Sequence, residues 1–159
     1  MTNALSLRPG DRLPDFALPG LDGKLRKFIW SFTGQPVALL AVADLAALDG
    51  AQFAGLVLRC KDAATVPVVV CGNAIAAAAP LWSKLDGAAS DVLLLCDGER
   101  RLVPALLAQA GMALGQSSGL RQRVIVLDPN QRVATTFDTR ALLAAAESIG
   151  AVADSVRST

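Results

Sequence analysis

The chain of 159 residues contains no histidine. This absence excludes Ser–His and Cys–His nucleophile pairs, histidine-ligated zinc or haem, and any imidazole general base. Clustered basic charge is also missing, because no run of Lys or Arg exceeds two residues and the formal net charge is +1. We therefore expect no nucleic-acid or anionic-membrane surface built on phosphate contacts.

Apolar runs of membrane-spanning length are absent as well. The longest, "VALLAVADLAAL" (37–48), is interrupted by Asp44 and is shorter than the roughly 20 residues that a bilayer requires. The N-terminal stretch "MTNALSLRPGDRLPDF" has no apolar h-region, so we expect no secretory signal. Three cysteines, an odd number without framework spacing, fit a reducing compartment. These features predict a cytoplasmic protein without membrane association.

Cofactor motifs are also lacking. The sequence has no GxGxxG, no P-loop, no CxxC and no carboxylates paired at hydrolase-like spacing. Nucleotide binding, phosphoryl transfer and disulfide exchange through a CxxC motif therefore have no support. We predict that the protein carries no cofactor and no metal.

What the sequence does contain is an alternation of apolar runs and helical patterns. The AVILMFWYC residues make up 53% of the chain, which is typical of a globular protein with an apolar interior. Gly20 and the Asp22–Gly23 pair are expected to supply positive-φ turn positions in the first hairpin. Pro80 either kinks its helix or lies in its first turn. The predicted elements are a hairpin over 16–30, strand 37–43, helix 44–61, strand 66–72, helix 73–85 capped by Asn73, strand 91–97, helix 99–110, a strand–turn–strand unit over 123–137, and helix 139–149 with Thr139 as its N-cap.

This order predicts an α/β protein with a mixed central sheet and helices on both faces. Parallel strands joined by crossovers, with one antiparallel hairpin at the end, are compatible with a thioredoxin-like fold. We expect one domain over residues 1–150 and a flexible C-terminal tail over 151–159.

Four segments resemble one protein family in the correct order. They are "RPGDRLPDFALPGLDGKLRKF" (8–28), "GQPVALLAV" (34–42), "LLLCDGERRL" (93–102) and "RQRVIVLDPNQRV" (121–133). Together they resemble peroxiredoxins of the alkyl hydroperoxide reductase and thiol-specific antioxidant family, with the N-terminal hairpin of that family. The resemblance extends over residues 8 to about 148 and implies a thioredoxin-like redoxin fold with an antioxidant ancestry.

The sequence departs from the family where the family keeps its chemistry. The resemblance implies a Pro-x-x-x-Thr-x-x-Cys segment that opens the helix after the first core strand. Its cysteine attacks the peroxide as a thiolate, held by an arginine and by the helix N-terminus. The matching positions here are degenerate: Ala43 for the proline, Ala47 for the threonine, Gly50 or, with a one-residue gap, Asp49 for the cysteine, and Gln122 for the arginine. The resemblance thus predicts a pseudoenzyme that has lost the peroxidatic cysteine.

Three thiols and two arginines remain to be assigned. Cys60 has the spacing of a helix position that faces the core. Cys71 and Cys96 each end a predicted buried strand. In the resembled fold those strands are parallel neighbours, so both thiols should lie toward the carboxyl edge of the sheet. They are either small buried hydrophobes or a weak redox pair. Arg121 and Arg123 flank Gln122 and are either solvated strand-edge charges, an anion or partner site, or a substitute for the missing arginine after a register shift.

Three functions are therefore open from the sequence. The first is a non-catalytic interaction or regulatory module that binds a protein partner or forms a homodimer. The second is an unconventional thiol-dependent oxidoreductase that uses Cys71 or Cys96. The third is a small-molecule binder or repurposed enzyme that uses the pocket vacated around Ala43, Ala47, Gly50 and Arg121.

Overall fold

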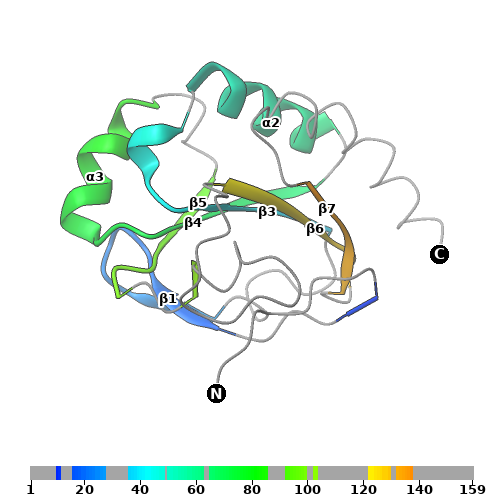
Figure 1. The fold of residues 1–159 in the computed structure, drawn as a ribbon, viewed down its shortest axis with the longest axis horizontal. Coiled ribbons are helices and arrows are strands. Elements are labelled where there is room, and N and C mark those ends of the chain that lie inside the picture. The colour runs from blue at the N-terminus through cyan, green and yellow to red at the C-terminus, as the bar shows by residue number, and fades with distance from the viewer. Residues whose placement is uncertain are drawn as a thin grey trace.

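The computed structural model shows a mixed five-stranded sheet with two helices packed on it (Figure 1). The residues that the structure describes are 10–11, 16–27, 36–48, 50–62, 65–85, 92–99, 102–103, 122–129 and 132–137. The predicted helix 139–149 and tail 151–159 lie outside these residues, as does the predicted helix 99–110 after residue 103.

The sheet has the order β5–β4–β3–β6–β7. Its strands are β3 (Val37–Val42), β4 (Val66–Cys71), β5 (Leu93–Cys96), β6 (Gln122–Leu127) and β7 (Val133–Phe137). β3, β4 and β5 are parallel, whereas β6 runs antiparallel to both of its neighbours, β3 and β7. All six residues of β3 are buried, which explains why this central strand is a continuous apolar run in the sequence. The predicted mixed sheet is confirmed.

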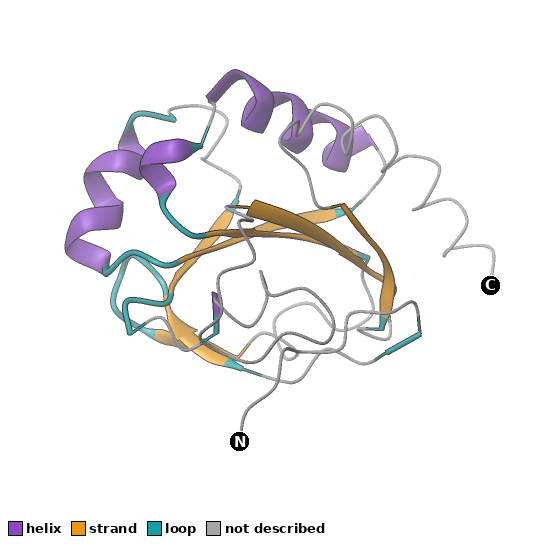
Figure 2. Cartoon of the chain, in the orientation of Figure 1, coloured by secondary structure: helices purple, strands orange, loops and turns teal. Residues whose placement is uncertain are grey.

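Side-chain alternation along the strands divides the core into two layers. Leu40, Val69 and Val124 lie on the face that packs against the helices, together with Phe53 and Trp82. The rings of Phe53 and Trp82 are 5.6 Å apart between centroids and join the two helices to each other. Figure 2 shows the helices that contain Phe53 and Trp82 on this side of the sheet. The opposite layer is built from Leu39, Val68 and Ile125, with Phe16, Leu18 and Val103 packed against them.

The predicted helix over 44–61 is in fact two helices. A 3-10 helix η1 (Leu45–Ala47) ends at Leu48, whose φ of −76° and ψ of 126° are extended, and α2 (Gly50–Asp62) follows. The Asp44 carboxylate accepts a hydrogen bond from the Ala46 N–H at 3.0 Å and caps η1. A single continuous helix over 44–61 was therefore wrong, because the extended backbone at Leu48 separates η1 from α2.

Helix α3 (Ile75–Ser83) passes through Pro80, and its N-cap is Ala74, without a side-chain hydrogen bond. The predicted cap at Asn73 was wrong. The Asn73 side chain instead accepts a hydrogen bond from the Leu45 N–H at 2.9 Å and donates one to Asp44 at 3.1 Å. This asparagine thus ties the loop after β4 to the loop after β3. No described helix has the length and apolar character needed to cross a membrane.

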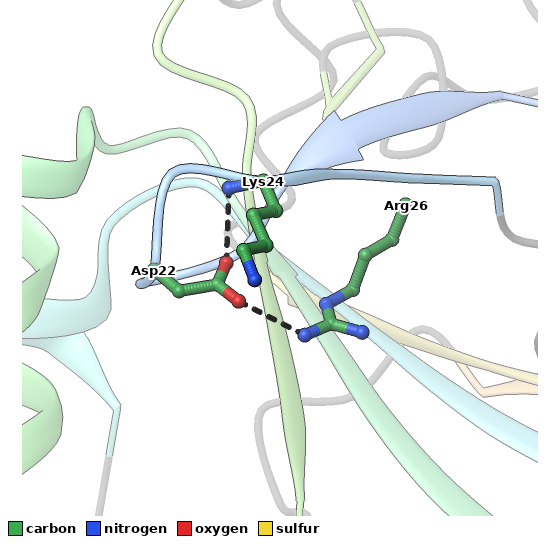
Figure 3. Close-up of polar contacts among 3 residues, drawn as sticks. All are labelled: Asp22, Lys24 and Arg26. Carbon is green, nitrogen blue, oxygen red and sulfur yellow. Dashed lines mark hydrogen bonds and ion pairs between the residues drawn. The ribbon is translucent and has the colours of Figure 1, made fainter.

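The N-terminal hairpin pairs β1 (Ala17–Pro19) with β2 (Leu25–Lys27). Gly23 has a φ of 79°, as predicted, but Gly20 does not take a positive φ and is buried instead. The Asp22 carboxylate accepts hydrogen bonds from the Lys24 N–H and from Arg26 Nη2, both at 3.0 Å (Figure 3). These contacts lower the pKa of Asp22, the Lys24 backbone bond contributing most. The side chain of Asp22 therefore closes the turn.

Candidate functional site

Gly50 is the first residue of α2 and is exposed. Among the described residues, a Cβ added there would meet only Leu85 Cδ2, at 3.6 Å, which is ordinary van der Waals contact. A helix N-terminus offers free N–H groups and a partial positive charge, which stabilise an anion such as a thiolate. The structure thus places Gly50 at a helix start that follows a core strand, with no sulfur on it. Asp49 lies outside the described residues.

The segment leading to this helix start is held by polar contacts between loops. Ala43 is half-buried and packs into the layer opposite α2, and Ala47 lies in η1. The Asp44–Asn73 hydrogen bond fixes the segment from the side of β4. Neither alanine offers a hydroxyl or ring where the family resemblance predicts threonine and proline.

The register of β6 decides which of its polar residues faces α2. Gln122 pairs with Val42, and Arg123 pairs with Ala41. Because Val124 belongs to the helix-side layer, alternation places Gln122 on the same face as α2 and Arg123 on the other face. Arg123 is only 5% exposed there, so it could substitute beside Gly50 only after a register shift that exchanges the two faces of β6. Arg121 lies outside the described residues.

Cys60 lies on the buried face of α2 among helix-side core residues. Burial raises the pKa of its thiol to about 12, which keeps the sulfur protonated and unreactive at neutral pH. The predicted packing role of Cys60 is confirmed.

Cys71 and Cys96 lie side by side at the ends of two parallel strands. They are direct register partners in the β4–β5 pair, both are buried, and both are free thiols. The Cys71 Sγ also donates a hydrogen bond to the Asn73 carbonyl oxygen at 3.8 Å. The neighbouring Cys71 thiol lowers the pKa of Cys96, and the same interaction, together with burial, raises the pKa of Cys71. Cys96 is therefore the thiol of this pair that ionises first.

A cavity of about 680 Å³ lies beside these strand ends. Cys96 and Asp97 border it, and most of its surface is apolar. Its other lining residues come from the hairpin, from the start of α3 and from the loop after β5: Phe16, Ala17, Leu18, Pro19, Leu25, Ala74, Ile75, Gly98, Glu99 and Leu102. The described residues of the predicted vacated pocket, Ala43 and Gly50, do not border it. Sequence reasoning missed this cavity, because nothing in the hairpin sequence shows that it packs over the carboxyl ends of β4 and β5.

Two residues shape the wall of this cavity. The Asp97 Oδ2 accepts hydrogen bonds from the N–H groups of Leu102, at 2.8 Å, and Val103, at 2.7 Å, which folds the loop after β5 back on itself. A Cβ added at Gly98 would lie 3.0 Å from the Ala74 Cα, so only glycine allows the two loops to approach this closely. The described residues hold no cluster of three or more metal-ligating side chains.

No family model matches the chain, and no curated protein matches it. Solved structures do match over nearly its whole length. Peroxidoxin BcpB from Mycobacterium tuberculosis aligns with a TM-score of 0.72 at 16% identity, over 96% of this chain and 99% of that chain. A peroxiredoxin-like protein from Aquifex aeolicus aligns with a TM-score of 0.64 at 12% identity, over 93% of this chain and 89% of that chain.

A third match belongs to a different branch of the same fold. A SCO1/SenC family lipoprotein from Bacillus anthracis str. Ames aligns with a TM-score of 0.66 at 13% identity, over 93% of this chain and 99% of that chain. Identities this low establish the fold and nothing finer. The chain has a thioredoxin-like fold, as its sequence predicted.

Proposed function

We propose that this protein is a peroxiredoxin-like protein that has lost the peroxidatic cysteine and acts as a non-catalytic interaction module. The observation that carries the proposal is Gly50 at the first position of α2. Peroxide reduction by this fold needs a thiolate nucleophile at a site that stabilises negative charge. The helix start keeps its partial positive charge, but glycine supplies no nucleophile.

None of the three thiols of the chain lies where the missing one would be. Cys60 is in the same helix but ten residues further along, or about 15 Å at 1.5 Å per residue. Cys71 and Cys96 lie in the sheet, paired with each other rather than at the start of α2. The face of β6 that α2 covers presents Gln122 rather than an arginine. Among the described residues, the start of α2 thus carries no thiol and the adjoining face of β6 presents no arginine, which supports the proposal.

The test is a gain of function at one position. The Gly50→Cys variant should consume hydrogen peroxide in the presence of a thiol reductant at least tenfold faster than the wild type, because the new thiol stands at an exposed helix N-terminus. Gly50→Ser is the matched control and should remain at the wild-type rate. Wild-type consumption as fast as that of Gly50→Cys would contradict the proposal.

The proposed association with a second chain is tested separately, by the mass of the protein in solution. The largest exposed apolar side chain on α2 is Leu58, which is 61% exposed and offers a contact to a second chain. Sedimentation velocity should show a species heavier than the 16.4 kDa monomer, either a homodimer or a complex with a co-purified protein. A strict monomer at all concentrations that retrieves no partner would contradict it.

The cavity favours small-molecule binding as a second candidate function. A volume of about 680 Å³ with an apolar lining lies within the range of ligand pockets. A ligand that binds only the folded chain raises its apparent stability, so a thermal-shift screen of small apolar compounds should yield concentration-dependent increases in Tm. The Ala17→Trp variant, whose indole would fill the cavity from the hairpin side, should lose these shifts.

A further inference from the structure

The Cys71–Cys96 pair is a feature that the proposed function leaves unused. The two residues are directly opposite each other in a parallel strand pair, and both side chains belong to the helix-side layer of the core. Adjacent strands lie about 4.8 Å apart, and the Cα atoms of a disulfide usually lie about 4.4–6.8 Å apart. The backbone of β4 and β5 therefore already holds these cysteines at a distance that a disulfide can bridge.

The pair also has a route to the outside. Cys96 is only 2% exposed, but it borders the cavity, as do Leu18 of the hairpin and Ile75 of α3. The cavity is large enough for a small organic molecule, and its lining is mostly apolar. A reagent with an apolar group should therefore reach Cys96 more readily than a fully hydrated one does.

We propose that Cys71 and Cys96 form a reversible disulfide when an organic hydroperoxide enters this cavity. This modification site goes beyond the proposed function, because it involves neither Gly50 nor a catalytic cycle. The buried position of both sulfurs makes the reaction slow and stoichiometric. Disulfide formation in proteins takes seconds to hours, depending on access.

The reaction has two steps. The Cys96 thiolate attacks the outer oxygen of the hydroperoxide, the O–O bond breaks, and the leaving alkoxide takes up the proton that the Cys96 thiol released. Cys96 then carries a sulfenic acid. The Cys71 sulfur attacks the Cys96 sulfur, the S–S bond forms, and the S–O bond breaks to release water with the Cys71 proton. Two thiols and one hydroperoxide thus become one disulfide, one alcohol and one water, and a thiol reductant reverses the change.

Peptide mapping of the wild-type chain is the decisive experiment. Treatment with tert-butyl hydroperoxide should remove two of the three titratable thiols, lower the intact mass by two hydrogen atoms and yield one linked peptide pair that contains Cys71 and Cys96. A phosphine reductant should restore all three thiols. Three thiols that persist after treatment, or a linkage between two chains, would overturn the proposal.

Three single variants separate the roles of the cysteines. Cys60→Ser is the matched control, because Cys60 is an equally buried thiol without a partner sulfur in register, and it should still lose two thiols. Cys71→Ser should stop at a sulfenic acid on Cys96 that dimedone traps. Cys96→Ser should leave Cys71 unreacted. A dimedone adduct on Cys71 in this last variant would contradict the assigned order of attack.

The route through the cavity is tested separately. Ala17→Trp should slow disulfide formation by tert-butyl hydroperoxide at least fivefold, because Ala17 is exposed and lines the cavity. Ala77→Trp is the control, since Ala77 is exposed on α3 and does not line it. Equal slowing in both variants, or none in either, would show that the oxidant does not arrive through this cavity. The Gly50→Cys peroxidase assay is unaffected by either outcome, so the two proposals fail independently.

Discussion

Gly98 and Gly50 differ in how much space a side chain would have at each position. A Cβ at Gly98 would stand 3.0 Å from the Ala74 Cα and 3.2 Å from its Cβ, whereas a Cβ at Gly50 would meet only the end of the Leu85 side chain, at 3.6 Å. Gly98 is therefore required by the packing of two loops, and Gly50 is not required by packing at all. The absence of a side chain at the start of α2 has no steric explanation in the described structure.

The Gly98→Ala variant should be less stable than the wild type by about 1–3 kcal/mol, because the Ala74 backbone must move to admit the methyl group. Urea unfolding followed by far-UV circular dichroism measures the difference. Gly50→Ala is the matched control and should gain about 0.4–1 kcal/mol, since alanine fits there and reduces the entropy of the unfolded chain. Equal losses in the two variants would contradict this account of Gly98.

At the scale of elements, the sequence predicted which segments form strands better than where helices begin. The apolar runs at 37–42, 66–71 and 93–96 can be read directly, because buried parallel strands are apolar on both faces. The start of η1 could not be read, because its first N–H, that of Leu45, bonds to the Asn73 side chain from another loop. The preference of asparagine for helix N-caps predicts that Asn73 caps the helix that follows it. In the structure its side chain bonds instead to Leu45 and Asp44, which are distant in sequence.

Helix α3 contains a residue that works against it. Pro80 lies in its interior, where it cannot donate the backbone hydrogen bond to the Ala76 carbonyl. Because the Pro80 ring is exposed, its packing does not compensate for the lost hydrogen bond. The helix is instead secured by Ala78 and Trp82, which face the core.

Replacing Pro80 should therefore stabilise the protein. In a helix interior proline is about 3 kcal/mol less favourable than alanine, and part of this is offset because proline also restricts the unfolded chain. We expect Pro80→Ala to raise the free energy of unfolding by about 1–2 kcal/mol, measured by thermal or urea unfolding. Ala76→Gly, an exposed position of the same helix, should lower it by about 1 kcal/mol. A loss of stability in Pro80→Ala would show that the ring packs against a neighbour.

At the scale of the whole molecule, the fold could be predicted and the cavity could not. The order of elements and their apolar pattern suffice for a mixed sheet, and the likeness of solved structures confirms the thioredoxin-like fold. The carboxyl-edge position of Cys71 and Cys96 also followed from the sequence. Their exact pairing did not, because a shift of one residue between β4 and β5 leaves the apolar pattern unchanged when both faces are buried.

The cavity combines three segments that are distant in the chain: residues 16–19 with Leu25, residues 74–75, and residues 96–99 with Leu102. No local pattern links them, because their contact is set by how the hairpin packs across the sheet layer that contains Leu39 and Val68. The sequence predicted a vacated pocket near Gly50, because small residues stand there in place of the larger side chains of the resembled family. The structure places a large apolar space at the carboxyl ends of β4 and β5, next to one of the thiols, and Gly50 does not border it.

Burial of a thiol also couples the stability of the whole fold to pH. The pKa of Cys60 is raised from 9.0 to about 12, so the folded chain keeps a proton that the unfolded chain releases. The free energy of unfolding should therefore fall as the pH rises above about 9, by about 1.4 kcal/mol between neutral pH and pH 10. Urea unfolding of the reduced protein at both pH values measures this loss. Cys60→Ala should lose correspondingly less over the same interval, and an identical loss in both proteins would show that Cys60 does not carry the effect.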